Sequence, residues 1–183
     1  MLFLYVEIHH RPKELYFLLQ SHVKTVSDSS FKELYPMLKV EQNELNVETT
    51  AIWEKKKYGH VLRTGFTEKI SFGCPPEFGG ETNLPTPEDL FLASIATCTL
   101  TSLLRICESL RTTPKSLNVT TSAVLEFKKE KNDFAFSTIK CKINISGDEF
   151  LLERACQLVP KYCIIGKSII PKIEYENDII SED

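Results

Sequence analysis

The feature of this sequence that most constrains the fold is a stretch without a single charged residue, residues 90–104. Thr86 and Pro87, just before it, are typical of a helix N-terminus, as the cap and the first helical residue. A helix that is apolar nearly all round is buried in a protein core or in a bilayer. Fifteen uncharged residues, several of them Ser or Thr, fall short of the roughly 20 that a membrane span needs. The sequence therefore predicts the central helix of a soluble domain, with no membrane segment.

One thiol, Cys98, lies in the middle of this helix on its polar side. Positions three, four and seven residues apart share a helical face. The face of Cys98 carries Ser94, Thr101, Ser102 and Arg105. A buried free cysteine is often a small inert residue. The helix by itself therefore leaves two interpretations open, a structural thiol and a reactive one.

The composition limits the classes of function. A net charge of -3, without a basic cluster interleaved with aromatic residues, argues against a nucleic-acid partner. Six cysteines in 183 residues are too few for a scaffold built on disulfides. Neither a CxxC motif nor a Cys–His spacing typical of zinc occurs, so we expect no metal and no other cofactor. Free thiols indicate a reducing compartment, and we expect a cytoplasmic protein.

Alternating patterns on both sides of the central helix predict strands. A period of two begins at Glu44 and continues through an antiparallel meander to residue 72. After the central helix we predict two strands, a helix that Pro160 ends, a helical turn and a last strand, at residues 119–127, 134–146, 147–160, 164–169 and 171–175. The expected fold class is α+β, with antiparallel sheets around a buried central helix. We expect residues 1–36 to be a partly helical extension and residues 37–183 to be the compact domain.

Among the six cysteines, Cys163 has the local sequence that most favours a reactive thiolate. It stands at the predicted start of the helical turn, where the helix dipole favours negative charge. Lys161 and Lys167 add positive charge nearby. The sequence therefore predicts a lowered pKa for Cys163.

The spacing of the other cysteines argues against most disulfides. Cys98 and Cys107 would lie about 13 Å apart along one helix, whereas a disulfide needs Cα atoms closer than about 7 Å. Cys156 and Cys163 would be about 10 Å apart if helix continued between them. Cys141 belongs to the core face of its strand, and we interpret it as structural. Cys98 and Cys163 remain as the sensible pair of an attacking and a resolving thiol.

Several motifs resemble the family of osmotically inducible protein C and organic hydroperoxide resistance protein (OsmC/Ohr). They are Pro76-Glu77-Phe78-Gly79-Gly80, Pro87-Glu88-Asp89-Leu90, Ala96-Thr97-Cys98, and Tyr162-Cys163 before Lys167-Ser168. Their order and spacing fit from about residue 44 to 176. The resemblance implies an intertwined homodimer and a thiol peroxidase that acts on organic hydroperoxides in the oxidative stress response. Cys98 would be the peroxidatic thiol and Cys163 the resolving thiol.

The resemblance also implies a Glu–Arg pair that activates the first thiol. Glu88 matches the glutamate, ten residues before Cys98. Because ten helical residues span about 15 Å, Glu88 would act on the Cys98 of the other chain. The alternative is that Glu88 only favours the helix N-terminus. Arg63 is the only arginine in the matching strands, although the family's position falls nearer His60. Arg105 is the second candidate for an arginine near the thiol.

The leading hypothesis is an organic hydroperoxide reductase of the peroxiredoxin type, with an external dithiol as reductant. Phe91 and Leu92 would favour an apolar hydroperoxide, and Thr101 and Arg105 would complete the substrate-binding residues. The alternative is a non-catalytic OsmC-like dimer that binds an apolar small molecule, with incidental thiols.

Overall fold

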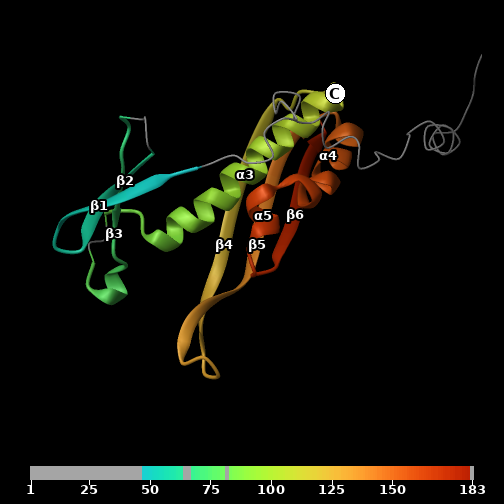
Figure 1. Cartoon of the computed structure of the whole chain (residues 1–183). Coiled ribbons are helices and arrows are strands. Elements are labelled where there is room, and N and C mark those ends of the chain that lie inside the picture. Colours follow the sequence, from blue (N-terminus) through green and yellow to red (C-terminus); the bar gives the residue numbers. More distant parts are fainter. Residues whose placement is uncertain (1–46, 64–66, 81–82, 182–183) are drawn as a thin grey trace, which may run out of the picture. The chain divides into compact units, whose positions relative to one another are not determined.

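The structure, a computed structural model, describes residues 47–63, 67–80 and 83–181. The predicted extension over residues 1–36 lies outside the described residues. The elements follow in the order β1, β2, β3, a short 3₁₀ helix η2 (Pro76–Phe78), then α3, β4, β5, α4, α5 and β6 (Figure 1).

Helix α3 (Pro87–Ser109) is the predicted central helix. Thr86 and Asp89 form a capping box, because each side chain accepts a hydrogen bond from the backbone N–H of the other. The helix packs against β4, α4 and α5. Its length and apolarity would also suit a membrane span, and 33% of its most apolar window is buried in the single chain. The packing on three elements fits a core helix.

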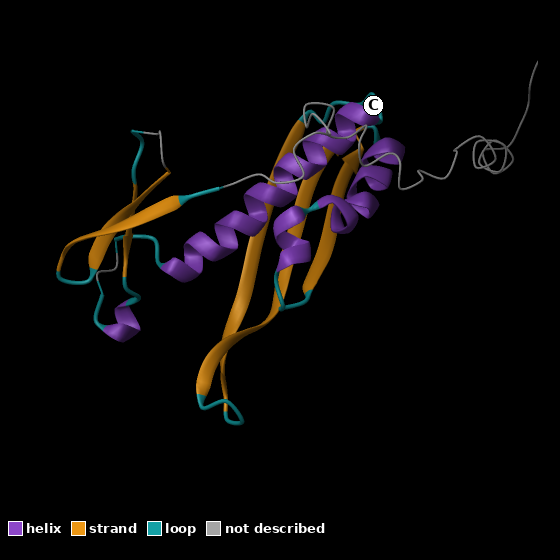
Figure 2. Cartoon of the chain, viewed as in Figure 1, coloured by secondary structure: helices purple, strands orange, loops and turns teal. Residues whose placement is uncertain are grey.

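Strands β1 (Thr49–Lys55), β2 (Tyr58–Arg63) and β3 (Ile70–Gly73) form an antiparallel sheet in sequence order. This arrangement is the predicted meander (Figure 2). Gly59 permits the close approach of β1, since a Cβ atom there would lie 2.1 Å from the carbonyl oxygen of Ile52. Ile52, Trp53 and Ile70 are exposed apolar side chains of this sheet.

The second sheet has the order β4 (Ser116–Lys128), β5 (Asp133–Gly147), β6 (Ile173–Ser181). Strands β4 and β5 are antiparallel, as predicted, but β6 runs parallel to β5, with Cys141 opposite Tyr175. The reason is the crossover through α4 (Glu149–Tyr162) and α5 (Ile164–Ser168), which returns the chain to the end of the sheet where β5 begins.

Two predicted ends need correction. Helix α4 does not end at Pro160 but continues to Tyr162, and the N–H of Cys163 still donates to the carbonyl of Val159 at 2.9 Å. Proline removes only the hydrogen bond of its own missing N–H and crowds the turn before it, so the residues after Pro160 can still donate within the helix. Strand β6 continues past the predicted residue 175 to Ser181, because its ladder with β5 extends to Gly147.

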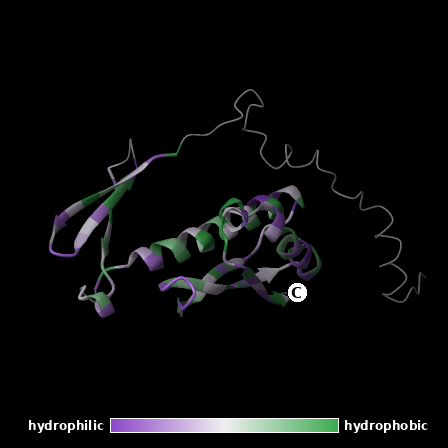
Figure 3. Ribbon diagram, turned by 60° about the horizontal axis from the view of Figure 1, so that its bottom comes forward, coloured by the Kyte–Doolittle hydropathy of each residue, from purple (hydrophilic) through white to green (hydrophobic). Residues whose placement is uncertain are grey.

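The core lies between α3, α4 and the inner face of the second sheet. Its fully buried residues include Ile95, Leu103, Ile106, Ile139, Cys141, Ile143, Ile145, Leu152, Ala155 and Val159. Hydrophobic residues recur along α3 and the strands and helices that follow it (Figure 3). Cys141 is buried on the core face that the alternation predicts.

Candidate functional site

Helices α3 and α5 bring the two predicted thiols together. The backbone N–H of Ile165 donates to the sulfur of Cys98 at 3.5 Å. The next N–H, that of Gly166, donates to the sulfur of Cys163 at 3.3 Å. The side chains of Cys98 and Cys163 also interact with one another. Two successive amides of α5 therefore hold the two sulfur atoms side by side.

The electrostatic prediction for Cys163 is wrong. The residue does cap α5, as expected, but it is 0% exposed, and burial raises the pKa of its thiol. The Gly166 N–H and the Thr99 hydroxyl oppose this rise, whereas the Cys98 side chain adds to it. The loss of hydration raises the pKa more than the Gly166 N–H lowers it, because few groups solvate the buried thiolate. Lys161 and Lys167 are exposed, and the Nζ atom of Lys161 lies 5.7 Å from the centre of the Tyr162 ring.

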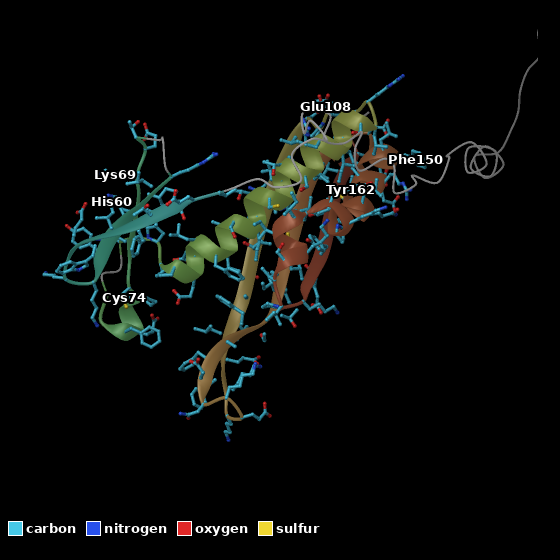
Figure 4. The ribbon with its side chains drawn as sticks, in the orientation of Figure 1. His60, Lys69, Cys74, Glu108, Phe150 and Tyr162 are labelled. Carbon is cyan, nitrogen blue, oxygen red and sulfur yellow. The ribbon has the colours of Figure 1, made fainter. Side chains whose placement is uncertain are left out.

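The two thiols differ in access. Cys98 is half-buried, while Cys163 and the preceding Tyr162, labelled in Figure 4, are buried. A reagent from solvent therefore meets Cys98 first. This difference suits an attacking thiol that is reachable and a second thiol that is sheltered.

Three residues beside Cys163 were not predicted as part of the site. The hydroxyl of Thr99 lies 3.8 Å from the sulfur of Cys163 and also 3.8 Å from that of Cys141. Tyr175 reaches the same place from β6 and interacts with both Thr99 and Cys163. Residues opposite one another in a parallel ladder share a face of the sheet, so only the register of β5 with β6 could have revealed this cluster.

The predicted substrate residues on the polar face of α3 bind mainly within their own helix. The Thr101 hydroxyl donates to the carbonyls of Thr97 and Cys98. Arg105 forms an ion pair with Glu108 at 3.9 Å. Both residues therefore have partners on α3 itself.

Glu88 and Leu92 lie apart from the thiols, in a groove of about 490 Å³. Other lining residues are Phe78, Leu125 and Phe136. Among the residues described, the Oε2 atom of Glu88 is buried and has no hydrogen-bond partner.

Phe91 stands seven positions before Cys98 and so shares its helical face. Its ring stacks on that of Phe136, with centroids 5.0 Å apart. Together with Ile170 and Pro171 it lines a second groove, of about 660 Å³. The two predicted apolar residues, Phe91 and Leu92, therefore line different grooves.

The predicted basic partner of the first thiol lies on β2. Arg63 is exposed at the end of β2. His60, also on β2 and labelled in Figure 4, is 7% exposed, and its Nδ1 atom lies 2.7 Å from the Glu54 carboxylate. Within the described part of the chain, no group of three His, Cys, Asp or Glu residues is placed to hold a metal ion.

Comparison with known proteins identifies the class. A family model described as OsmC-like protein matches residues 79–176, more than half of the chain. The chain therefore belongs to the OsmC-like family, and its α+β fold is that of OsmC and Ohr proteins. None of the curated proteins matches this chain.

Solved structures share the fold at low sequence identity. An OsmC-like protein of unknown function from Vibrio cholerae is 18% identical, with a TM-score of 0.63 over 75% of this chain and 100% of that one. An organic hydroperoxide resistance protein from Legionella pneumophila is 21% identical, with a TM-score of 0.57 over 75% and 98%. The organic hydroperoxide resistance protein of Bacillus subtilis is 14% identical, with a TM-score of 0.56 over 74% and 98%.

Proposed function

We propose that the protein is a thiol-dependent peroxidase that reduces organic hydroperoxides to alcohols. The observation that carries the proposal is the pairing of Cys98 and Cys163, whose sulfur atoms accept hydrogen bonds from successive amides of α5 at 3.5 and 3.3 Å. Family membership and the structural neighbours named for hydroperoxide resistance support the same chemistry.

The reaction has three steps. The thiolate of Cys98 attacks the outer peroxide oxygen, the O–O bond breaks, and the alkoxide takes a proton and leaves as the alcohol. The resulting sulfenic acid condenses with the thiol of Cys163, which forms the disulfide and releases water. An external dithiol then reduces the disulfide by exchange and is itself oxidised to a disulfide. No cofactor takes part.

Apolar side chains next to the helical face of Cys98 support an apolar hydroperoxide. Phe91, on that face, lines the 660 Å³ groove with Phe136, Ile170 and Pro171, and the charged residues Lys128, Glu130 and Lys131 complete most of its lining. Ile170 is fully exposed. Burial of a hydrocarbon chain against such residues favours binding by roughly 25 cal/mol for each Å² removed from water, and hydrogen peroxide has no such surface to bury.

The proposed active form is a homodimer with a shared site. Only 33% of the most apolar window of α3 is buried in the single chain, so much of its apolar surface would have to be buried by another chain. The buried, unpartnered Oε2 of Glu88 calls for a hydrogen-bond donor or a cation. Glu88 stands too far along α3 to meet the Cys98 of its own helix. A second chain would meet both needs.

A peroxidase assay tests the proposal. Cumene hydroperoxide and a dithiol, either dithiothreitol or dihydrolipoamide, serve as substrates for the wild-type chain and for Cys98→Ser, Cys163→Ser and Cys107→Ser. Cys107 is a buried cysteine of the same helix and provides the matched control. We expect the first two variants to lose the dithiol-dependent activity and the control to retain it. Wild-type protein that consumes no hydroperoxide, or full activity in Cys98→Ser, contradicts the proposal.

A specific observation favours a second candidate, a module that binds an apolar small molecule. The 490 Å³ groove is lined mainly by aromatic and aliphatic side chains, with the carboxylates of Glu77, Glu88 and Asp89, and it does not include Cys98. In that case an apolar fluorescent probe should bind equally well to the wild-type chain and to Cys98→Ser, while Leu92→Asp should abolish binding and no hydroperoxide should be consumed.

A further inference from the structure

We propose that Thr99 and Tyr175 are positioning residues whose hydroxyls hold the sulfur of Cys163 while that sulfur carries negative charge. They would act when the Cys98–Cys163 disulfide closes and when it reopens. The inference rests on the proposed function, which it deepens by assigning a role to groups around the second thiol.

Thr99 approaches Cys163 from α3, one position after Cys98. Its hydroxyl lies 3.8 Å from the sulfur of Cys163, and it accepts a hydrogen bond from the thiol of Cys141, also at 3.8 Å. The Thr99 oxygen can accept from Cys141 while its one hydroxyl proton is donated to Cys163, and Tyr175 also interacts with this hydroxyl. Cys141 thus orients Thr99, and Thr99 acts on Cys163.

Tyr175 approaches from β6. A Cβ atom built on Gly166 would lie 3.1 Å from the Tyr175 hydroxyl oxygen and 3.2 Å from the sulfur of Cys163. Both groups therefore border the same small space beside α5. Burial raises the pKa of Tyr175, and nearby Cys163 and Cys141 add to the rise. Near neutral pH Tyr175 therefore keeps its proton and can serve as a donor, not as a base.

The chemistry explains why a buried thiol needs these donors. On closure, the Cys163 thiolate attacks the sulfur of the Cys98 sulfenic acid, the S–S bond forms, and hydroxide leaves and becomes water with the proton released by Cys163. On reopening, a dithiol attacks the more accessible sulfur of Cys98, and Cys163 leaves as the thiolate. In both directions the charge appears on Cys163, where burial disfavours it.

The polar groups near the sulfur of Cys163 come from several elements of the fold. The titratable side chains that act in this cluster are Cys98 from α3, Cys141 from β5 and Tyr175 from β6. All three are neutral when protonated and add no positive charge. In the described part of the chain, the hydroxyls of Thr99 and Tyr175 join the Gly166 N–H, at 3.3 Å, as donors to this thiolate.

Two pairs of variants test the inference. Thr99→Val removes the hydroxyl with little change of shape, and Thr99→Ser retains it. Tyr175→Phe removes the second hydroxyl, and Tyr162→Phe makes the same change in a buried tyrosine adjacent to Cys163 in the chain. Trypsin releases residues 162–167 as a peptide with Cys163 as its one cysteine, so the state of this thiol can be followed by mass spectrometry.

The first measurement is the rate at which dithiothreitol regenerates the Cys163 thiol, read after acid quenching. The disulfide is closed beforehand with diamide, a general thiol oxidant, so the measurement does not depend on peroxidase activity. We expect Thr99→Val and Tyr175→Phe each to slow reopening by about tenfold, the effect of one hydrogen bond to a charged group. Thr99→Ser and Tyr162→Phe should stay within about twofold.

The second measurement is the pH profile of Cys163 alkylation by iodoacetamide in a Cys98→Ser chain. Loss of either hydroxyl should move the midpoint upward by about one pH unit, which a merely structural role would not do. Unchanged rates and midpoints in both Thr99→Val and Tyr175→Phe overturn the inference. If diamide forms the disulfide in the wild-type protein but cumene hydroperoxide does not oxidise the thiols, the proposed function is overturned instead. The two failures are therefore distinguishable.

Discussion

Gly166→Ala should damage both the stability of the fold and the closure of the disulfide. The residue lies in α5, and its backbone φ is outside the left-handed region, so the backbone itself accepts alanine. The obstacle is space. The added methyl group would lie 3.1 Å from the Tyr175 hydroxyl and 3.2 Å from both the Cys163 sulfur and the Cδ1 of Ile173.

Two opposing effects set the size of the change. Alanine in place of glycine stabilises a helix interior by up to about 1 kcal/mol, and less in a helix of five residues. Insertion of a methyl group into a packed site costs about 1 to 3 kcal/mol. Three simultaneous close contacts place the cost in the upper part of that range, so we expect a net loss of about 1 to 2 kcal/mol in the free energy of unfolding.

The assay is urea unfolding of the reduced protein, with Ser168→Ala as a control in the same helix. The displaced sulfur should also close the disulfide about three- to fivefold more slowly, because a shift of a few tenths of an ångström disturbs the approach to Cys98. In a Cys163→Ala background, which removes one contact, Gly166→Ala should cost less. Gly166→Ala protein that is as stable as wild type and closes its disulfide at the same rate would refute the reasoning.

Two further predictions concern the dimer and the pH dependence of stability. Inactive Cys98→Ser and Glu88→Ala chains should regain activity when they are refolded together, because each heterodimer holds one intact shared site. If Glu88→Ala alone is inactive, a mixture that is no more active than the two parent variants contradicts the shared site. Burial raises the pKa of Cys156, 2% exposed, from 9.0 to about 11. Since the neutral thiol is favoured in the fold, its contribution is complete below pH 9 and disappears between pH 9 and 11. Urea unfolding should therefore show the stability difference between wild type and Cys156→Ala falling by about 2 to 3 kcal/mol over that range, and a constant difference contradicts this.

Local patterns were enough to predict most elements of the fold. The uncharged residues 90–104 with the cap at Thr86 predicted α3, and alternation predicted the meander and the β4–β5 pair. These signals work because helix capping and side-chain periodicity depend on residues close in the sequence. The proximity of Cys98 and Cys163 was also predictable, since helical spacing excluded other pairings and the motifs agreed.

The properties of the site depend instead on contacts between distant residues. The prediction for Cys163 rests on its helix start and two lysines, but burial raises its pKa, and groups from α3, β5 and β6 lie near its sulfur. The same holds for Cys141 and Tyr175, which lie side by side because β6 pairs with β5 in a parallel register, and for Thr99, which meets Cys141 from helix α3. Sequence by itself determined which residues form each element and which thiols are the candidates. The tertiary structure alone decided how the second thiol is solvated, because desolvation depends on everything that surrounds a group and not on its neighbours in the chain.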